Sequence, residues 1–151
     1  MTQPQGTREH RIVVGVDGSV PSKAALAWAI RQARLTGAEV EAVTAWHFPI
    51  AFGYPQPVVT DVINYQELAT QTLGDAIAET SRPGDPVKIT PRVVEGNAAQ
   101  ALIDAAAGAE LLVVGSRGHG GFVEALLGSV GQHCVQHAPC PVLVIRDSVT
   151  G

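Results

Sequence analysis

The sequence predicts an α/β protein with a doubly wound parallel sheet. Short apolar runs rich in β-branched residues alternate with segments whose apolar residues recur at helical spacing. The first run, residues 11–17 (RIVVGVD), is almost unbroken, as in a strand covered on both faces. The 151 residues, 46% of them hydrophobic, suffice for one domain with a real core. Strands that alternate with helices require right-handed crossovers, so we expect parallel strands with helices on both faces.

The first half of the chain holds two of the expected strands and two helices. Ser19 marks the start of the first helix and Gly37 its end. Residues 39–46 predict the second strand. Residues 47–60 form a long loop punctuated by Pro and Gly, whose apolar residues we expect to fold back as a lid. A helix is expected over residues 61–80.

The second half continues the alternation. Residues 87–94 predict the third strand, and Pro91 places it at a sheet edge. Asn97 followed by Gln100 resembles a capping box for the next helix, which Gly108 ends. The remaining expected elements are a strand at residues 111–114, a helix at 128–137 and a strand at 141–146.

The segment between the fourth strand and the last helix is rich in glycine. Residues 115–129 (GSRGHGGFVEALLGS) hold five of the sixteen glycines. Ligands of doubly wound sheets bind beyond the carboxyl ends of the strands, where this segment begins. Bare backbone brings amides close to an anion, and a helix N-terminus favours negative charge. We therefore prefer a phosphate site to a merely flexible connection, although the segment is neither a Walker A loop nor a Rossmann fingerprint.

Charge and the N-terminal residues restrict the partners. The net charge is about −4, with two lysines and no basic cluster, so nucleic acid is not an expected partner. The polar residues 1–10 predict a flexible tail rather than a signal peptide, and no apolar run is long enough to span a membrane. We expect a cytoplasmic protein whose two cysteines are reduced.

Several ordered stretches resemble the universal stress protein family. They are VGVDGS at 14–19, GNAAQALIDAA at 96–106, LLVVGSRGHGG at 111–121, LLGSV at 126–130 and HAPCPVLVIR at 137–146. The spacing Gly115-x2-Gly118-x9-Gly128-Ser129 is similar to the signature of the ATP-binding branch. The resemblance makes residues 11–147 the family domain. It implies a five-stranded parallel sheet of order 3-2-1-4-5, with the adenine-nucleotide alpha-hydrolase-like fold.

The resemblance also implies an adenine-nucleotide site. Asp17 would lie near the ribose, or near a Mg²⁺ ion that it holds through water, and the backbone of Ala45 would meet the adenine. The other residues that the resemblance places at the nucleotide are Gly15, Gly115, Ser116, Arg117, Gly118, His119, Gly120, Gly121, Gly128, Ser129 and Val130.

Function follows from the same resemblance. It implies an ATP-binding stress-response protein that acts by nucleotide-dependent binding and signalling, as a homodimer joined through residues 141–146. The chain offers too few groups for fast phosphoryl transfer, so we expect no enzyme beyond slow ATP hydrolysis or autophosphorylation. A cyclic-AMP-binding relative and a nucleotide-free dimeric interaction module are the alternatives. A receiver domain is disfavoured because Asp17 stands alone and the last strand carries Arg146 instead of lysine.

Four residues near the C-terminus suggest zinc but do not predict a zinc site. His133 and Cys134 would project about 100° apart from one helix. Cys140 lies between two prolines that fix an extended segment. We expect Cys134 to be a buried apolar residue and His137 to lie at the end of the helix.

Overall fold

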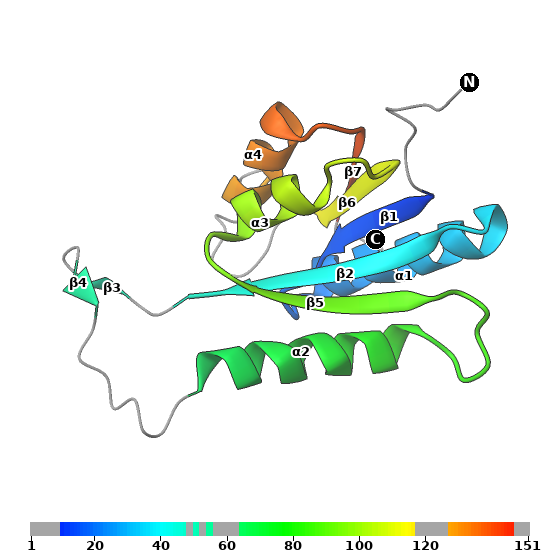
Figure 1. The fold of residues 1–151 in the computed structure, drawn as a ribbon, viewed down its shortest axis with the longest axis horizontal. Coiled ribbons are helices and arrows are strands. Elements are labelled where there is room, and N and C mark those ends of the chain that lie inside the picture. Colours follow the sequence, from blue (N-terminus) through cyan, green and yellow to red (C-terminus); the bar gives the residue numbers. More distant parts are fainter. Residues whose placement is uncertain (1–9, 48–49, 52–53, 56–63, 117–126, 147–151) are drawn as a thin grey trace.

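Five parallel strands form the central sheet of the computed structural model, which describes residues 10–47, 50–51, 54–55, 64–116 and 127–146 (Figure 1). The strands are β1 (Arg11–Gly15), β2 (Glu39–Trp46), β5 (Ile89–Glu95), β6 (Leu111–Gly115) and β7 (Val142–Ile145). Their order across the sheet is β5-β2-β1-β6-β7. Numbered along the chain, this is the expected order 3-2-1-4-5, and β5 with Pro91 is an edge strand as predicted. Residues 1–9 of the predicted tail lie outside the described residues.

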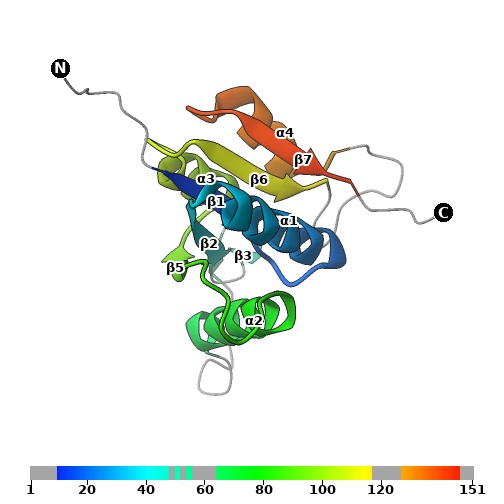
Figure 2. The ribbon, with the colours of Figure 1, turned by 90° about the vertical axis from the view of Figure 1, so that its right-hand side faces the viewer.

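Two helices cover each face of the sheet. The helices are α1 (Val20–Thr36), α2 (Tyr65–Thr80), α3 (Ala98–Ala105) and α4 (Ser129–His137). Figure 2 shows α1 and α2 on one face and α3 and α4 on the other. Ile12 and Val14 pack in the core on the α1–α2 face, whereas Val13 packs on the α3–α4 face, and all three are fully buried. This two-sided burial explains why the first strand reads as an unbroken apolar run.

Side chains and glycine fix the helix ends much as expected. Ser19 Oγ accepts a hydrogen bond from the Ser22 backbone N–H at 3.3 Å, which caps α1. Gly37 closes α1 in the left-handed conformation, with φ 83°, where a residue with a Cβ is strained. Asn97 Oδ1 accepts from the Gln100 N–H at 3.0 Å. The Gln100 side chain, however, donates to its own helix, so only this half of the capping box is seen.

Some predicted boundaries were wrong. The first strand ends at Gly15 rather than at residue 17, because Asp17 Oδ1 accepts from the Ser19 N–H at 2.9 Å and thereby forms a turn. The third strand starts two residues later than predicted, and α4 begins after Gly128. Helix α3 ends at Ala105, before Gly108, which was expected to end it. The helix expected from residue 61 begins at Tyr65, capped by Asn64, and residues 61–63 lie outside the described residues.

The long loop after β2 contains regular structure that its composition did not predict. Strands β3 (Ile50–Ala51) and β4 (Tyr54–Pro55) pair in an antiparallel fashion. The remaining residues of the loop beyond position 47, and the side chains of these two strands, lie outside the described part of the structure, so the lid stays a prediction. Helices α1 to α4 all fall short of the length and hydropathy that a membrane span needs.

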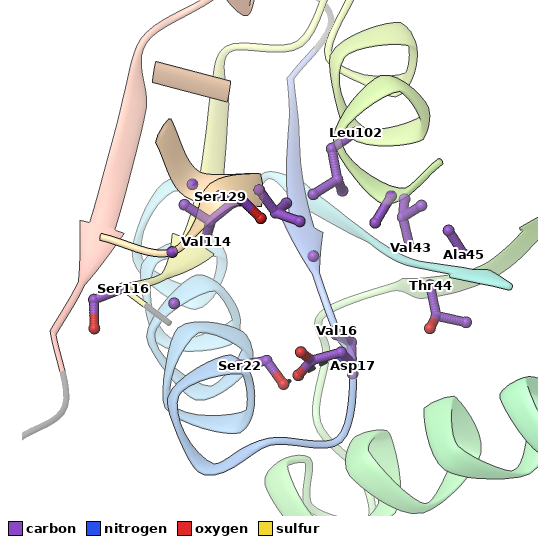
Figure 3. Close-up of a pocket in the computed structure, with 16 residues that line it drawn as sticks. Val16, Asp17, Ser22, Val43, Thr44, Ala45, Leu102, Val114, Ser116 and Ser129 are labelled. Carbon is purple, nitrogen blue, oxygen red and sulfur yellow. Dashed lines mark hydrogen bonds between the residues drawn. The ribbon is translucent and has the colours of Figure 1, made fainter. Parts of the chain in front are cut away.

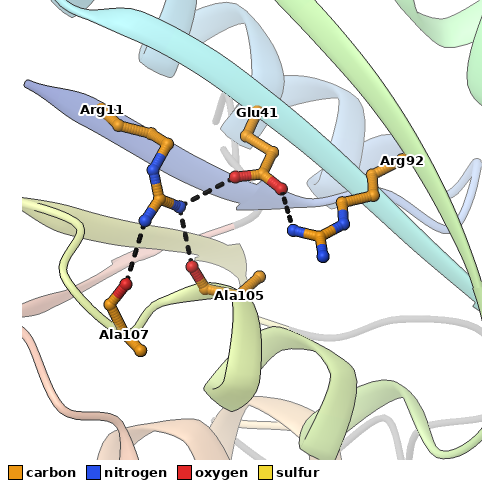
Figure 4. A network of polar contacts seen from close by, with 5 residues as sticks. All are labelled: Arg11, Glu41, Arg92, Ala105 and Ala107. Carbon is orange, nitrogen blue, oxygen red and sulfur yellow. Dashed lines mark hydrogen bonds and ion pairs between the residues drawn. The ribbon is translucent and has the colours of Figure 1, made fainter. Parts of the chain in front are cut away.

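An ion-pair network ties residues of β1, β2 and β5 to the end of α3 (Figure 4). Arg11 Nη1 donates to Glu41 Oε1 at 2.8 Å and to the Ala105 carbonyl at 2.7 Å. Arg11 Nη2 donates to the Ala107 carbonyl at 2.9 Å. The second oxygen of Glu41 pairs with Arg92. Because the Glu41 side chain is only 10% exposed, the two arginines compensate for the water that its carboxylate loses on folding.

We expect Glu41→Gln to lower the free energy of unfolding by about 2 kcal/mol, because the half-buried Arg11 loses its ion pair with Glu41. Arg92→Ala is the matched control, since Arg92 is 55% exposed and its pair is worth less than about 1 kcal/mol. Urea denaturation followed by circular dichroism measures both. Equal losses in the two variants would contradict this ranking.

Candidate functional site

Strands β1 and β6 part at their carboxyl ends. Their pairing ends at Val14. The next backbone donor of the first strand, Val16 N–H, bonds to Val43 of β2 at 2.9 Å. On the other side, Ser116 N–H bonds to Ile145 of β7 at 2.8 Å. The chain then continues into α1 on one face and towards α4 on the other, so this is the topological switch point of the sheet, where ligands bind.

A cavity of about 180 Å³ opens between these strand ends (Figure 3). Ser129 and Leu102 lie on one side of it, and Asp17 and Ser22 lie on the other. The cavity is lined by Gly15, Val16, Asp17, Ser22, Val43, Thr44, Ala45, Ala98, Leu102, Val114, Gly115, Ser116, Gly128, Ser129, Val130 and Gly131.

The cavity brings together most of the site residues named from the sequence. Those that line it are Gly15, Asp17, Ala45, Gly115, Ser116, Gly128, Ser129 and Val130. The other predicted residues, Arg117, Gly118, His119, Gly120 and Gly121, lie outside the described residues. The described wall therefore combines three strand ends with the first turn of α4.

Sequence reasoning missed the apolar wall and one serine. Val43 and Leu102 belong to the core on the α3–α4 face and also line the cavity. The sequence pattern indicated that both residues are buried. It could not show whether a buried residue packs in the core or lines a cavity. Ser22 Oγ accepts from the Asp17 N–H at 3.2 Å and donates to the Ser19 carbonyl at 3.0 Å. Nothing in the sequence pattern distinguished Ser22 from an ordinary first-turn serine.

The two strand-end glycines, Gly15 and Gly115, differ in how strictly packing requires them. A Cβ on Gly115 would lie 2.7 Å from the carbonyl carbon of Pro21 and 2.9 Å from its oxygen. A Cβ on Gly15 would lie 2.7 Å from Leu102 Cδ1. The first contact is with backbone and the second with a side chain that can turn away. Gly115 thus allows the start of α1 to press against the end of β6 and is not merely part of a flexible connection.

The first turn of α4 offers backbone donors to the cavity. Gly128, its N-cap residue, has no side chain to cap the helix, and its own N–H donates to the Ser116 carbonyl at 2.7 Å. The amides of Ser129, Val130 and Gly131 have no acceptor within the helix, and all three residues line the cavity. A helix start of this kind suits an anion.

The described part of the cavity lining carries a single charged side chain, Asp17. Asp17 is exposed, and its Oδ1 accepts from both the N–H and the Oγ of Ser19. Asp17 therefore both forms the turn before α1 and lines the cavity. The cavity can take an anionic group at the α4 amides, a hydroxyl-bearing group at Asp17 and an apolar group against Val43 and Leu102.

The cysteines take no part in this cavity. Cys134 is fully buried, as expected, and burial raises the pKa of its thiol to about 11. Cys140 is half-buried. Within the described residues, no group of three or more His, Cys, Asp or Glu side chains could hold a metal ion.

Comparison with known proteins shows the family to which this chain belongs. The profile described as the universal stress protein family matches residues 9–146. Universal stress protein Rv2623 of Mycobacterium tuberculosis is 37% identical over 150 residues, which are 99% of this chain but 48% of the relative. A universal stress protein of Thermus aquaticus is 33% identical over 138 residues, 89% of this chain and 97% of the relative. The chain thus spans about half the length of the mycobacterial relatives that it matches.

A solved structure shares the fold. A universal stress protein crystallised in complex with cAMP aligns with a TM-score of 0.70 and 26% sequence identity. The alignment covers 94% of this chain and 99% of that one.

We expect Gly115→Ala to lower the free energy of unfolding by about 2 kcal/mol, because the new methyl group overlaps the backbone of Pro21. Gly131→Ala is the matched control. Its Cβ meets Leu127 Cγ at 3.3 Å, and the helix propensity of alanine offsets that contact, so a change within about 0.5 kcal/mol is expected. Thermal and urea unfolding measure both variants. A Gly115→Ala protein as stable as the parent would show that the strand end can move.

Proposed function

This chain belongs to the universal stress protein family, and we propose that it binds an adenine nucleotide, ATP in preference, and acts by nucleotide-dependent binding and signalling. The observation that carries the proposal is the uncapped first turn of α4, which faces the cavity between the parted strand ends. Backbone amides at a helix start bind phosphate without lysine or arginine. The solved relative in complex with cAMP supports an adenine nucleotide.

We place the base, the ribose and the phosphates of the nucleotide according to the chemistry of the residues that line the cavity. Val43 and Leu102 supply the apolar surface that suits a base, and the backbone of Ala45 lies at the same end of β2. Asp17 would accept from a ribose hydroxyl. The phosphates would lie at the amides of Ser129 and Val130, where the helix dipole favours negative charge.

A magnesium ion is compatible with this arrangement. Mg²⁺ is bound through oxygen, commonly by one or two carboxylates together with phosphate oxygens and water. Asp17 supplies the carboxylate in the described lining of the same cavity, so it would hold the ion, directly or through water. The ion would supply the positive charge that no described lining residue offers.

Turnover is not part of the proposal. Fast phosphoryl transfer requires a cationic clamp and a positioned base. The described lining residues include Asp17 and three serines, Ser22, Ser116 and Ser129, but no lysine, arginine or histidine. We therefore propose slow hydrolysis or autophosphorylation at most.

We also propose a homodimer through β7. This strand lies at the sheet edge next to β6, and its four residues are half-buried. The Pro141 carbonyl accepts from Leu112 of β6, and the Ile145 carbonyl accepts from Ser116, just after β6. The alternate residues between them, Val142 and Val144, therefore turn their backbone polar groups outward. An apolar edge strand with outward donors and acceptors can pair with a second copy.

The nucleotide should be identifiable in the protein as purified. We expect denaturation to release about one ATP per chain, identified by mass spectrometry, and the stripped protein to bind ATP more tightly with magnesium than without. Cyclic AMP as the better ligand would make the chain a second-messenger binder, the second candidate, which the cAMP complex of the solved relative favours. Binding of neither nucleotide would favour the nucleotide-free interaction module.

The same binding assay can test the placement of the phosphates. Ser129→Asp puts a carboxylate at the first position of α4, where it stabilises the helix but repels phosphate. We expect ATP affinity to fall at least about tenfold while the melting temperature is kept or raised. Ser129→Asn, similar in size and neutral, is the control and should bind within a few-fold of the parent. Equal ATP affinities of the two variants would show that the phosphates do not lie at the start of α4.

The dimer can be tested without disturbing the sheet. Val144→Pro deletes an outward N–H and leaves the β6 hydrogen bonds in place, because proline is tolerated on the outer side of an edge strand. By light scattering we expect the parent to be a dimer and the variant to be a folded monomer. A variant that remains dimeric would place the interface elsewhere.

A further inference from the structure

Helix α4 carries two histidines on its exposed side. His133 and His137 are four residues apart, and both are exposed. Their ring centroids lie 4.7 Å apart, with the ring planes tilted by 46°. Residues at this spacing are neighbours on one helix face. Cys134, which projects about 100° away from His133, is fully buried, whereas both histidines are exposed, so the histidine pair faces solvent.

We propose that His133 and His137 form a two-imidazole site for a divalent transition-metal ion, with Cu²⁺ bound most tightly. Metal–nitrogen bonds to imidazole are about 2.0 Å long, so two rings in adjacent coordination positions have centroids about 4.5 Å apart. The observed separation of 4.7 Å is close to this value. Small rotations of the exposed rings would complete the chelate.

The number and type of ligands select the ion. No cluster of three or more His, Cys, Asp or Glu ligands occurs in the described residues, so water would fill the other coordination positions. Imidazole nitrogen suits Cu²⁺, Ni²⁺ and Zn²⁺, and the affinity order for such ligands peaks at Cu²⁺. Cu²⁺ also favours a square arrangement, in which two adjacent positions suit a pair on one helix face. A closed tetrahedral zinc site would need ligands that this pair lacks.

The position of His133 and His137 near the end of α4 affects both metal binding and the stability of the fold. His137 is the last residue of α4, where the helix dipole favours positive charge. A chelated ion would also join two successive turns of α4 and so stabilise the folded chain. Neither histidine lines the cavity, so the proposal stands apart from nucleotide binding.

The test is a Cu²⁺ titration of the full chain, purified without a histidine tag, by calorimetry and electron paramagnetic resonance. We expect one ion per chain, a spectrum with two nitrogen ligands and a higher melting temperature. His133→Ala and His137→Ala should each weaken binding at least about tenfold and abolish the shift in melting temperature. Alanine favours helix at these exposed positions, so both variants should fold.

Two further variants distinguish the pair from general histidine binding. The double variant His137→Ala with Val135→His keeps the number of histidines. It places the second histidine two residues after His133, on the other side of the helix. Val135 is 51% exposed, so the change is tolerated. We expect this variant to bind as weakly as His137→Ala, and His47→Ala to bind as the parent does. Parent-like affinity in the spacing variant, or an unchanged site in His133→Ala, would overturn the proposal.

Discussion

The close contact between the end of β6 and the start of α1 is the constraint on which the site depends. Gly115 lies against the backbone of Pro21 with no room for a Cβ. This contact keeps the start of α1 at the end of β6 while the first strand bonds away to β2 through Val16. A side chain at residue 115 would separate the two elements. The cavity is therefore a consequence of backbone packing.

The same packing holds the polar groups of the site in place. Gly128 N–H bonds to the Ser116 carbonyl and so anchors the start of α4 beside the end of β6. The amides of the first turn then point at a fixed position, with no cationic side chain among the described lining residues. Pre-oriented backbone dipoles lose little entropy on binding, whereas long lysine and arginine side chains must be ordered. This explains how a chain with two lysines and a net charge of about −4 can offer an anion site.

Local signals could be predicted from the sequence, and contacts between distant residues could not. Ser19 and Gly37 act through neighbouring backbone groups, so their residue types sufficed to place the ends of α1. The order of the strands came from the family resemblance, because periodicity does not say which strands are neighbours. Val43 and Leu102 were unrecognised as cavity wall for a related reason: an apolar residue at a buried position has the same pattern whether it meets a side chain or a ligand.

Helix α4 separates two kinds of binding chemistry along nine residues. Its first turn presents amides that have no acceptor within the helix, and the positive end of the dipole, to the cavity, which favours an anion. Its last residue, His137, lies at the negative end, which favours a cation. Buried Cys134 keeps the helix packed on the sheet and turns the two histidines to solvent, away from the cavity. The polarity of a single short helix therefore favours phosphate at one end and a metal ion at the other, and neither site needs the residues of the other.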